Sequence, residues 1–151
     1  MKIGIIGGTG LYGMSELKSV TRKILKTPFG APSDAFVCGK LEGREVVFLP
    51  RHGEGHRILP SEINYRANIF GMKMLGVGKV ISVSAVGSLK EEYRPGDIVL
   101  PDQYFDRTKA SDRHTFFGKG VVAHVSFADP VCADLRKAIA RTARNHVAKE
   151  L

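Results

Sequence analysis

The first half of the chain carries short apolar runs separated by glycine and proline, a pattern that predicts strands. Residues 2–10 (KIGIIGGTG) begin as an apolar run and meet glycines at once, which is typical of a buried strand ending in a turn where backbone can approach a ligand. After a Pro/Gly loop at residues 27–34, residues 35–50 (AFVCGKLEGREVVFLP) hold two β-rich runs on either side of Glu42-Gly43. These two runs predict a hairpin.

Helical periodicity follows the predicted hairpin. Residues 60–62 (PSE) form a helix start signal, with Ser61 as the N-cap and Glu62 in the first turn. Apolar residues then recur at helical spacing, at Ile63, Ala67, Phe70 and Met74. A helix is therefore expected between Ser61 and Gly76, the glycine that closes the pattern.

The second half of the chain predicts further strands and a second helix. Residues 79–89 (KVISVSAVGSL) read as a β-branched strand that runs into small residues, residues 94–106 as a turn and a short strand, and residues 120–127 (GVVAHVSF) as an alternating strand. Asp129 and Pro130 then predict the N-cap and first residue of a helix with an apolar stripe at Val131, Leu135, Ala138, Ile139 and Thr142. This order predicts an α/β fold with a mixed central sheet flanked by helices, in a single domain over residues 1–151.

Composition narrows the class of protein. A chain of 151 residues that is 43% hydrophobic holds one sizeable core, and no run is long enough for a signal peptide or a membrane span. Cys38 and Cys132 form no CxxC or metal-like spacing and are expected to be reduced thiols in the cytoplasm. The net charge of +8 is spread along the chain rather than gathered in a tract, so an anionic ligand and a solvated basic surface explain it better than a nucleic-acid partner.

The densest chemistry lies in residues 50–57 (PRHGEGHR), here called the charged loop. Its glycines argue against a helix, and three interpretations stay open: a metal site using His52, Glu54 and His56, a charged surface loop, or a pocket for a small anion. Arginine supplies a planar fork for phosphate, and glycines let the backbone come close to an anion. Glu54 and Arg57 have no assigned role beyond surface charge.

The glycines after the first strand allow a second interpretation. Gly8, Gly10 and Gly13 match the spacing GxGxxG of dinucleotide-binding domains, but the acidic residue at the expected distance, Asp34, precedes a strand instead of ending one. A turn whose backbone N–H groups and Thr9 hydroxyl hold a phosphate needs only what is present. The phosphate-binding turn is therefore favoured over a nicotinamide or flavin site.

Three segments lie just beyond the predicted ends of strands: Gly8-Thr9, Arg51-His52 and residues 84–87. Ligands of open α/β sheets bind in the crevice at this end of the strands. Three such loops can surround one phosphate. The inference depends on their convergence, because each residue alone would more often be an ordinary loop residue.

The same residues belong to segments that resemble a known protein family. The segments GIIGGTGLY, TPFGAPSDAF, LPRHGEGHRILPSEINYRANIFGMK, SAVGSLKEEYRPGDIVLPDQYFDRT and VVAHVSFADPVC closely resemble, in order, the N-terminal part of the S-methyl-5'-thioadenosine phosphorylase family, in the trimeric branch of the purine nucleoside phosphorylases. The resemblance implies a nucleoside phosphorylase fold and a pentosyltransferase. Such an enzyme converts methylthioadenosine and phosphate to adenine and 5-methylthioribose 1-phosphate, as a cytoplasmic homotrimer without metal or organic cofactor.

The resemblance also implies roles for individual residues. Thr9, Arg51, His52, Ser84 and Ala85 would bind phosphate, whereas His56 and Pro60 would lie near the 5'-alkylthio end of the substrate and His124 would reach a neighbouring subunit's site. Family members continue into segments that bind the ribose and base and supply a general-acid aspartate, which are expected to be absent here. No catalytic residue is therefore assigned. The alternatives are an inactive phosphate-binding fragment and a 6-oxopurine or methylthioinosine phosphorylase.

Overall fold

The computed structural model describes residues 1–8, 14–108 and 114–147. The described residues fall into two compact units: a first unit of residues 1–8, 14–85 and 114–116, and a second unit of residues 86–108 and 117–147. The first unit holds the strands β1 (Lys2–Gly7), β2 (Lys18–Lys23), β3 (Phe36–Leu41), β4 (Arg44–Pro50) and β5 (Val77–Ser82), the 3-10 turn η2 (Pro60–Glu62) and helix α1 (Tyr65–Met74). The second holds helix α2 (Ala133–Val147). The expected single domain over residues 1–151 stays a prediction.

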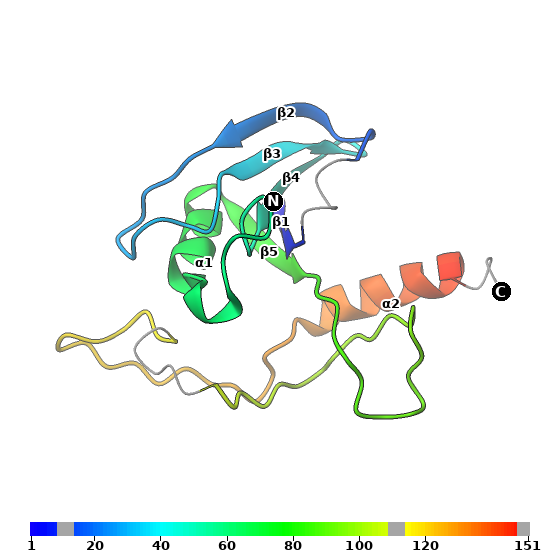
Figure 1. Ribbon diagram of the computed structural model, residues 1–151. Coiled ribbons are helices and arrows are strands. Elements are labelled where there is room, and N and C mark those ends of the chain that lie inside the picture. Colours follow the sequence, from blue (N-terminus) through cyan, green and yellow to red (C-terminus); the bar gives the residue numbers. More distant parts are fainter. Residues whose placement is uncertain (9–13, 109–113, 148–151) are drawn as a thin grey trace. The chain divides into compact units, whose positions relative to one another are not determined.

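The five strands form one mixed sheet in the order β2-β3-β4-β1-β5 (Figure 1). β1 lies between β4 and β5 and pairs with both in parallel, whereas β3 pairs antiparallel with β4 and with β2. The predicted mixed sheet is therefore confirmed. Its three parallel strands end at the same edge, so the loops that follow them start side by side.

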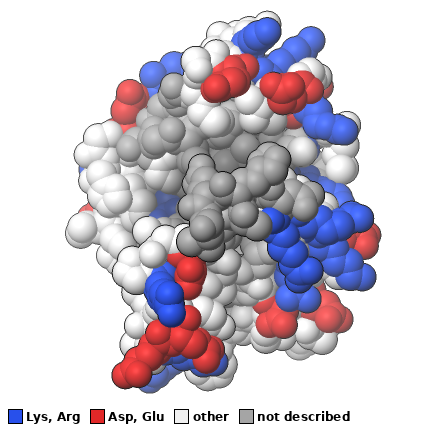
Figure 2. All heavy atoms as spheres, turned by 90° about the vertical axis from the view of Figure 1, so that its right-hand side faces the viewer, with Lys and Arg blue, Asp and Glu red and all other residues white. Residues whose placement is uncertain are grey.

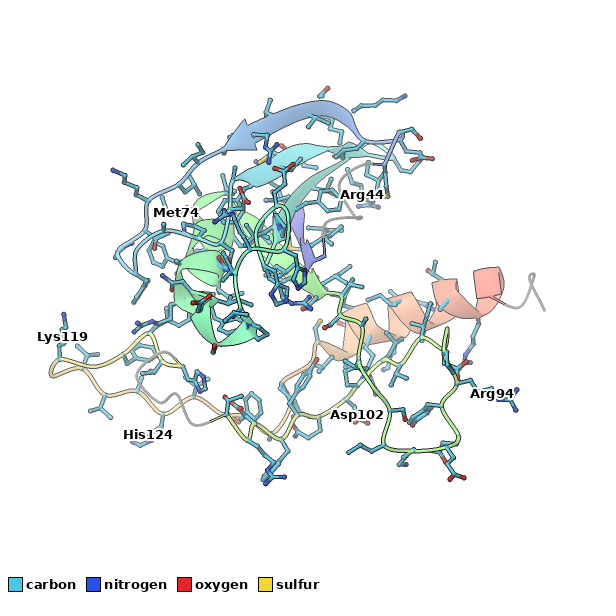
Figure 3. The ribbon with its side chains drawn as sticks, in the orientation of Figure 1. Arg44, Met74, Arg94, Asp102, Lys119 and His124 are labelled. Carbon is cyan, nitrogen blue, oxygen red and sulfur yellow. The ribbon has the colours of Figure 1, made fainter. Side chains whose placement is uncertain are left out.

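The predicted hairpin is confirmed, with Leu41 paired to Arg44 across a two-residue turn. Glu42 and Gly43 both have positive φ, at 47° and 74°. Such a turn matches the natural twist of the two strands, and glycine adopts the second position without steric cost. Arg44 therefore lies at the hairpin end of β4, and Arg51 follows the opposite end of the same strand (Figure 3).

The core packs on both faces of the sheet. One cluster joins strand residues to Met72 of α1, and the other lies on the opposite face; they comprise Ile6, Phe36, Val47, Leu49 and Met72, and Leu17, Val37, Val46 and Phe48. α1 approaches the sheet closely at Gly71, where a Cβ would lie 2.4 Å from Cζ of Phe36. A side chain at this position would push the helix away from Phe36, so glycine permits the close contact.

The predicted start of the first helix is wrong. Residues 60–62 form the separate turn η2, the backbone of Ile63 is extended, and α1 begins at Tyr65. Asn64 is the N-cap, since its Oδ1 accepts a hydrogen bond from Ala67 N at 3.1 Å. Asn64 Nδ2 also donates to Phe29 O at 2.7 Å, a tertiary contact that the helical pattern does not reveal. The predicted end is confirmed, because Gly76 follows the C-cap with a φ of +78°.

β2 was missed by the sequence pattern. All six of its residues are exposed, so no alternation of apolar and polar positions marks it as a strand. It forms by pairing with β3 at the edge of the sheet. The strand predicted from residue 79 begins earlier, at Val77, and ends at Ser82.

The second unit departs further from prediction. Residues 94–106 contain the predicted turn, closed by a bond from Asp97 N to Arg94 O at 3.1 Å, but they form no strand. Residues 122–127 form none either, and within the described residues no neighbouring strand pairs with this alternating run. A strand needs such a partner for its backbone N–H and C=O groups. The predicted helix exists but begins at Ala133 rather than after Asp129, with Cys132 O accepting the bond from Arg136 N at 2.9 Å.

Candidate functional site

The parallel strands β4, β1 and β5 bring two of the three predicted loops together at one edge of the sheet. Arg51 N donates to Gly7 O at 3.2 Å and Val83 N donates to Ile6 O at 2.8 Å, so the ladder continues past the strand ends into the loops. The backbone directions of the loops after β4 and β5 are therefore set by the sheet itself. This continuity makes the position of the site a consequence of strand pairing.

Arg51 spans the two loops with its guanidinium. Nη1 donates to Val83 O and Nη2 donates to Ser84 Oγ, both at 2.8 Å, and Nε donates to Nε2 of His52 at 3.1 Å. A guanidinium has five N–H donors, and these three bonds use one from each nitrogen. Each terminal nitrogen therefore keeps a second N–H for an anion while the fork is held in place.

His52 is buried and fixes one edge of that guanidinium. Its Nδ1 lies 2.9 Å from Ile58 O, and because a carbonyl can only accept, Nδ1 must carry the proton. Nε2 is then the acceptor for Arg51 Nε–H, which defines the neutral Nδ1–H tautomer. In this geometry His52 orients Arg51; a hydrogen bond from Nε2 to an anion would require a second proton on the ring. Its role in phosphate binding stays a prediction.

The charged loop is a series of tight turns and not a helix, as its glycines predict. Gly53 N donates to Pro50 O at 3.0 Å and His56 N donates to Gly53 O at 3.1 Å, while Gly53 and Gly55 have φ of +72° and +76°. His56 also has a positive φ, of 58°, and its ring stacks on His52 with centroids 4.4 Å apart. The loop thus holds the two imidazoles beside each other and close to Arg51.

The remaining charges of the loop, unexplained by the sequence, form ion pairs with neighbouring segments. Arg22 of β2 contacts Glu54, with Nη2 to Oε2 at 2.6 Å. Asp34 accepts at Oδ2 from Glu54 N at 2.7 Å and from Arg57 Nη2 at 3.2 Å. Sequence reasoning noted Asp34 only as a misplaced acidic residue and missed this role, because no local pattern signals a contact across 20 residues.

The electrostatics of Asp34 follow from these contacts. Partial burial raises its pKa, but hydrogen bonds from the N–H groups of Glu54 and Ala35 and from the Arg57 side chain outweigh it, so the pKa is lowered from its usual 3.8. Asp34 is therefore ionised at neutral pH.

The candidate metal ligands His52 and Glu54 are engaged in other contacts. His52 bonds to Arg51 and Ile58, and Glu54 pairs with Arg22. Residues 1–8, 14–108 and 114–147 hold no group of three His, Cys, Asp or Glu suited to a metal ion.

The other predicted site residues are not all brought to this edge. Ala85 follows Ser84, whose Oγ is 3.5 Å from Ala85 O, and Pro60 is an exposed residue of η2. His124 belongs to the second unit, on the irregular run before α2, and is exposed (Figure 3). Thr9 lies outside the described residues, as do Gly10 and Gly13 of the GxGxxG spacing.

Basic side chains are distributed rather than concentrated on the face that Figure 2 shows. Lys and Arg form several separate groups there, and the larger groups lie beside Asp or Glu side chains. Among the described residues, neither the length nor the apolar character of any helix suits a membrane crossing.

Comparison with known proteins gives a consistent result. The model of the phosphorylase superfamily matches residues 2–150. An S-methyl-5'-thioadenosine phosphorylase of Geobacter sulfurreducens is 66% identical over 133 residues, which are 88% of this chain and 46% of that protein. One of Hyperthermus butylicus is 59% identical over 94% of this chain and 52% of that protein. The chain thus spans about half the length of the curated relatives it matches.

Solved structures agree. A methylthioadenosine phosphorylase from an Antarctic soil metagenomic library superposes with a TM-score of 0.89 at 51% identity, over 95% of this chain and 50% of that one. A methylthioadenosine phosphorylase from Schistosoma mansoni in complex with adenine gives 0.87 at 42% identity, over 96% of this chain and 54% of that one. The fold inferred from the sequence is therefore that of phosphorylase structures over about half their length.

Proposed function

The chain belongs to the phosphorylase superfamily, and we propose that it supplies the phosphate-binding part of a methylthioadenosine phosphorylase. The reaction is attack of phosphate on the N-glycosidic bond of S-methyl-5'-thioadenosine, which releases adenine and forms 5-methylthioribose 1-phosphate. This transfer of a pentosyl group serves purine and methionine salvage. Relatives with this name, among them one at 66% identity, support the proposal.

One observation carries the proposal: the guanidinium of Arg51, fixed by Val83 O, Ser84 Oγ and His52, at the common edge of three parallel strands. A held fork with spare N–H donors suits a phosphate dianion, which prefers bidentate contact. Ser84 and Ala85 come after β5, separated from it by Val83, and Thr9 comes after β1 in the sequence. We propose these five residues, Thr9, Arg51, His52, Ser84 and Ala85, as the phosphate-binding set.

The proposed chemistry needs a fixed nucleophile. Loss of a purine from ribose gives a transition state in which positive charge develops at C1' and the ring oxygen. A phosphate held beside C1' both stabilises that charge and forms the new bond as the N-glycosidic bond breaks. Arg51 binds and orients the phosphate. The departing adenine must gain a proton or a strong hydrogen bond at N7, and we assign no residue of this chain to that step.

The proposal extends to the rest of the substrate and to assembly. His56 and Pro60 would contact the 5'-alkylthio group; the exposure of both residues, His56 in the charged loop and Pro60 in η2, supports this. We further propose a homotrimer in which the exposed His124 reaches a neighbouring subunit's site, in the cytoplasm and without metal or organic cofactor. Cys38 and Cys132 are not joined in a disulfide, which suits a reducing compartment.

The base is proposed to be adenine rather than hypoxanthine. The Schistosoma mansoni relative binds adenine. Comparing methylthioadenosine with methylthioinosine under the same conditions tests the choice, with faster cleavage of the adenine nucleoside expected and the reverse order contradicting it.

The experiment that tests the function is phosphate-dependent release of adenine from methylthioadenosine by the purified chain. We expect release that saturates with phosphate and falls by at least about 100-fold in Arg51→Ala, because an interaction with developing charge contributes roughly 3 kcal/mol. Arg44→Ala is the matched control, since it removes an exposed arginine at the hairpin end of the same strand. Phosphate binding without adenine release would overturn the enzymatic proposal for this chain and support a phosphate-binding fragment.

A further inference from the structure

Asp34 fastens the charged loop to the segment before β3, in addition to the ion pair between Glu54 and Arg22 of β2. Its side chain is 15% exposed, and its two oxygens accept three hydrogen bonds, from Ala35 N at 2.7 Å, Glu54 N at 2.7 Å and Arg57 Nη2 at 3.2 Å. Arg57 Nη2 also donates to Ser33 O at 3.1 Å. One carboxylate thus joins the segment before β3 to the middle and the end of the loop.

The loop carries this restraint to the candidate site. Ile58 follows Arg57 directly, and its carbonyl accepts the bond from Nδ1 of His52, while Ile58 N donates to His52 O at 2.9 Å. His52 Nε2 in turn accepts from Nε of Arg51. Asp34 is therefore linked to the arginine that spans the two loops by hydrogen bonds and by one covalent step, from Arg57 to Ile58.

Glycine at position 53 allows the fastening. Gly53 is buried with a φ of +72°, and a Cβ there would lie 3.0 Å from Nε of Arg57. Any side chain would therefore press on the arginine that Asp34 holds. The backbone of the loop and the ion pair fit each other closely.

We propose that Asp34 is a positioning residue for the phosphate site: its carboxylate fixes the charged loop so that Ile58 O holds His52 in the Nδ1–H tautomer and His52 holds Arg51. The inference deepens the proposed function and rests on it only for the ligand, phosphate. Asp34 lies outside the set of residues proposed to contact phosphate. It acts through the loop on the orientation of the guanidinium.

The test replaces Asp34 by Asn and measures two quantities on the full 151-residue chain. The first is the tautomer of His52, read from the chemical shifts of its ring nitrogens in the chain without ligand. The second is the dissociation constant for inorganic phosphate by titration calorimetry. Asn keeps the shape of the side chain but removes its charge and places an NH2 group where an acceptor is needed. Glu45→Gln is the matched control. It breaks an exposed ion pair with Lys2, 3.4 Å long, at the hairpin end of β4 in the same unit.

We expect Asp34→Asn to convert His52 from one tautomer to a mixture and to weaken phosphate binding by about tenfold, in keeping with the loss of charge-assisted hydrogen bonds. Glu45→Gln should change neither quantity. A single Nδ1–H tautomer and unchanged phosphate affinity in Asp34→Asn would overturn the inference.

Two further outcomes keep this test separate from that of the function. If Asp34→Asn does not fold, Arg57→Gln removes the other charge of the pair, and it should shift His52 and phosphate affinity in the same direction. If the unsubstituted chain binds no phosphate, the proposed function fails, while the tautomer of His52 still tests whether Asp34 orients that ring.

Discussion

The two units of the molecule use their apolar residues in opposite ways. Of the described residues, every buried hydrophobic side chain belongs to the first unit, including Phe36 and Phe48 at 0% and 1% exposure. In the second unit Phe105 and Val125 are 87% and 76% exposed, and along α2 Leu135 and Ile139 are only half-buried. A hydrophobic pattern therefore becomes a strand or a packed helix only where a partner covers it. The candidate site belongs to the unit in which such partners exist.

The largest expected effect contrasts one phenylalanine from each unit. Phe36→Ala should lower the free energy of unfolding of the first unit by about 3–5 kcal/mol, because it empties the contact between the sheet and Gly71 of α1. Phe105→Ala should change stability by no more than about 0.5 kcal/mol, since the ring is already in water. Urea denaturation followed by circular dichroism measures both. Equal losses of unfolding free energy in the two variants would contradict the difference in burial between the units.

The next largest loss of stability is expected from removing a buried side-chain amide. Asn68 is 2% exposed; its Oδ1 accepts from Ser33 N at 2.8 Å and its Nδ2 donates to Ser33 Oγ at 2.9 Å. Asn68→Ala leaves the buried Ser33 N–H without a partner and should cost about 1–3 kcal/mol in the same denaturation assay. Gln103, which donates to Ala128 O in the second unit from an exposed position, is the comparison.

For Gln103→Ala we expect a loss of no more than about 0.5 kcal/mol, because water replaces its bond. Similar losses at the two positions would show that burial does not set the difference.

The two glycines of the charged loop allow a comparison within the first unit. Gly53→Ala and Gly55→Ala both place a side chain at positive φ, which costs roughly 1–2 kcal/mol. Only the Cβ at position 53 meets another group, Nε of Arg57 at 3.0 Å, whereas nothing lies within 4 Å at position 55. Gly53→Ala should therefore be the more destabilising and should weaken phosphate binding as well, as thermal melting with and without phosphate can measure. Identical behaviour of the two variants would argue against the close fit of loop and ion pair.

The smallest expected effect is a difference in reaction rate between the two cysteines. Partial burial raises the pKa of the Cys38 thiol from its usual 9.0, a shift that nearby Lys23 and Lys2 reduce without cancelling. Because a smaller fraction of its thiol is ionised and its sulfur is less accessible, Cys38 should react with a thiol reagent more slowly than the exposed Cys132. We expect a difference of at least about tenfold near pH 8. Cys38→Ser and Cys132→Ser assign the two phases. A faster Cys38 would contradict its placement in the sheet.

Prediction from the sequence succeeded where the signal was local and failed where it depended on distant partners. The hairpin at Glu42-Gly43 and the end of α1 at Gly76 follow from backbone preferences of a few residues, and the sequence is enough to find them. β2 has no buried face to create a pattern, and residues 120–127 have the pattern but no paired strand in the described part of the chain.

The candidate site shows the same division. The positions of Arg51 and Ser84 after strands were predictable from the sequence, and the structure joins them at 2.8 Å. The fastening of the loop by Asp34 was not, because it depends on a contact between segments far apart in the chain. Alternation and spacing carry no information about such contacts.

Calorimetric titration of inorganic phosphate into the purified chain, and into its Arg51→Ala and Arg44→Ala variants, shows whether Arg51 builds an anion site. If Arg51 and its neighbouring loops form an anion site, the unsubstituted chain and Arg44→Ala should bind phosphate with the same affinity. Arg51→Ala should then bind at least about tenfold more weakly, because it loses charge-assisted hydrogen bonds. Equal affinity in all three proteins, or no binding by the unsubstituted chain, would contradict the account.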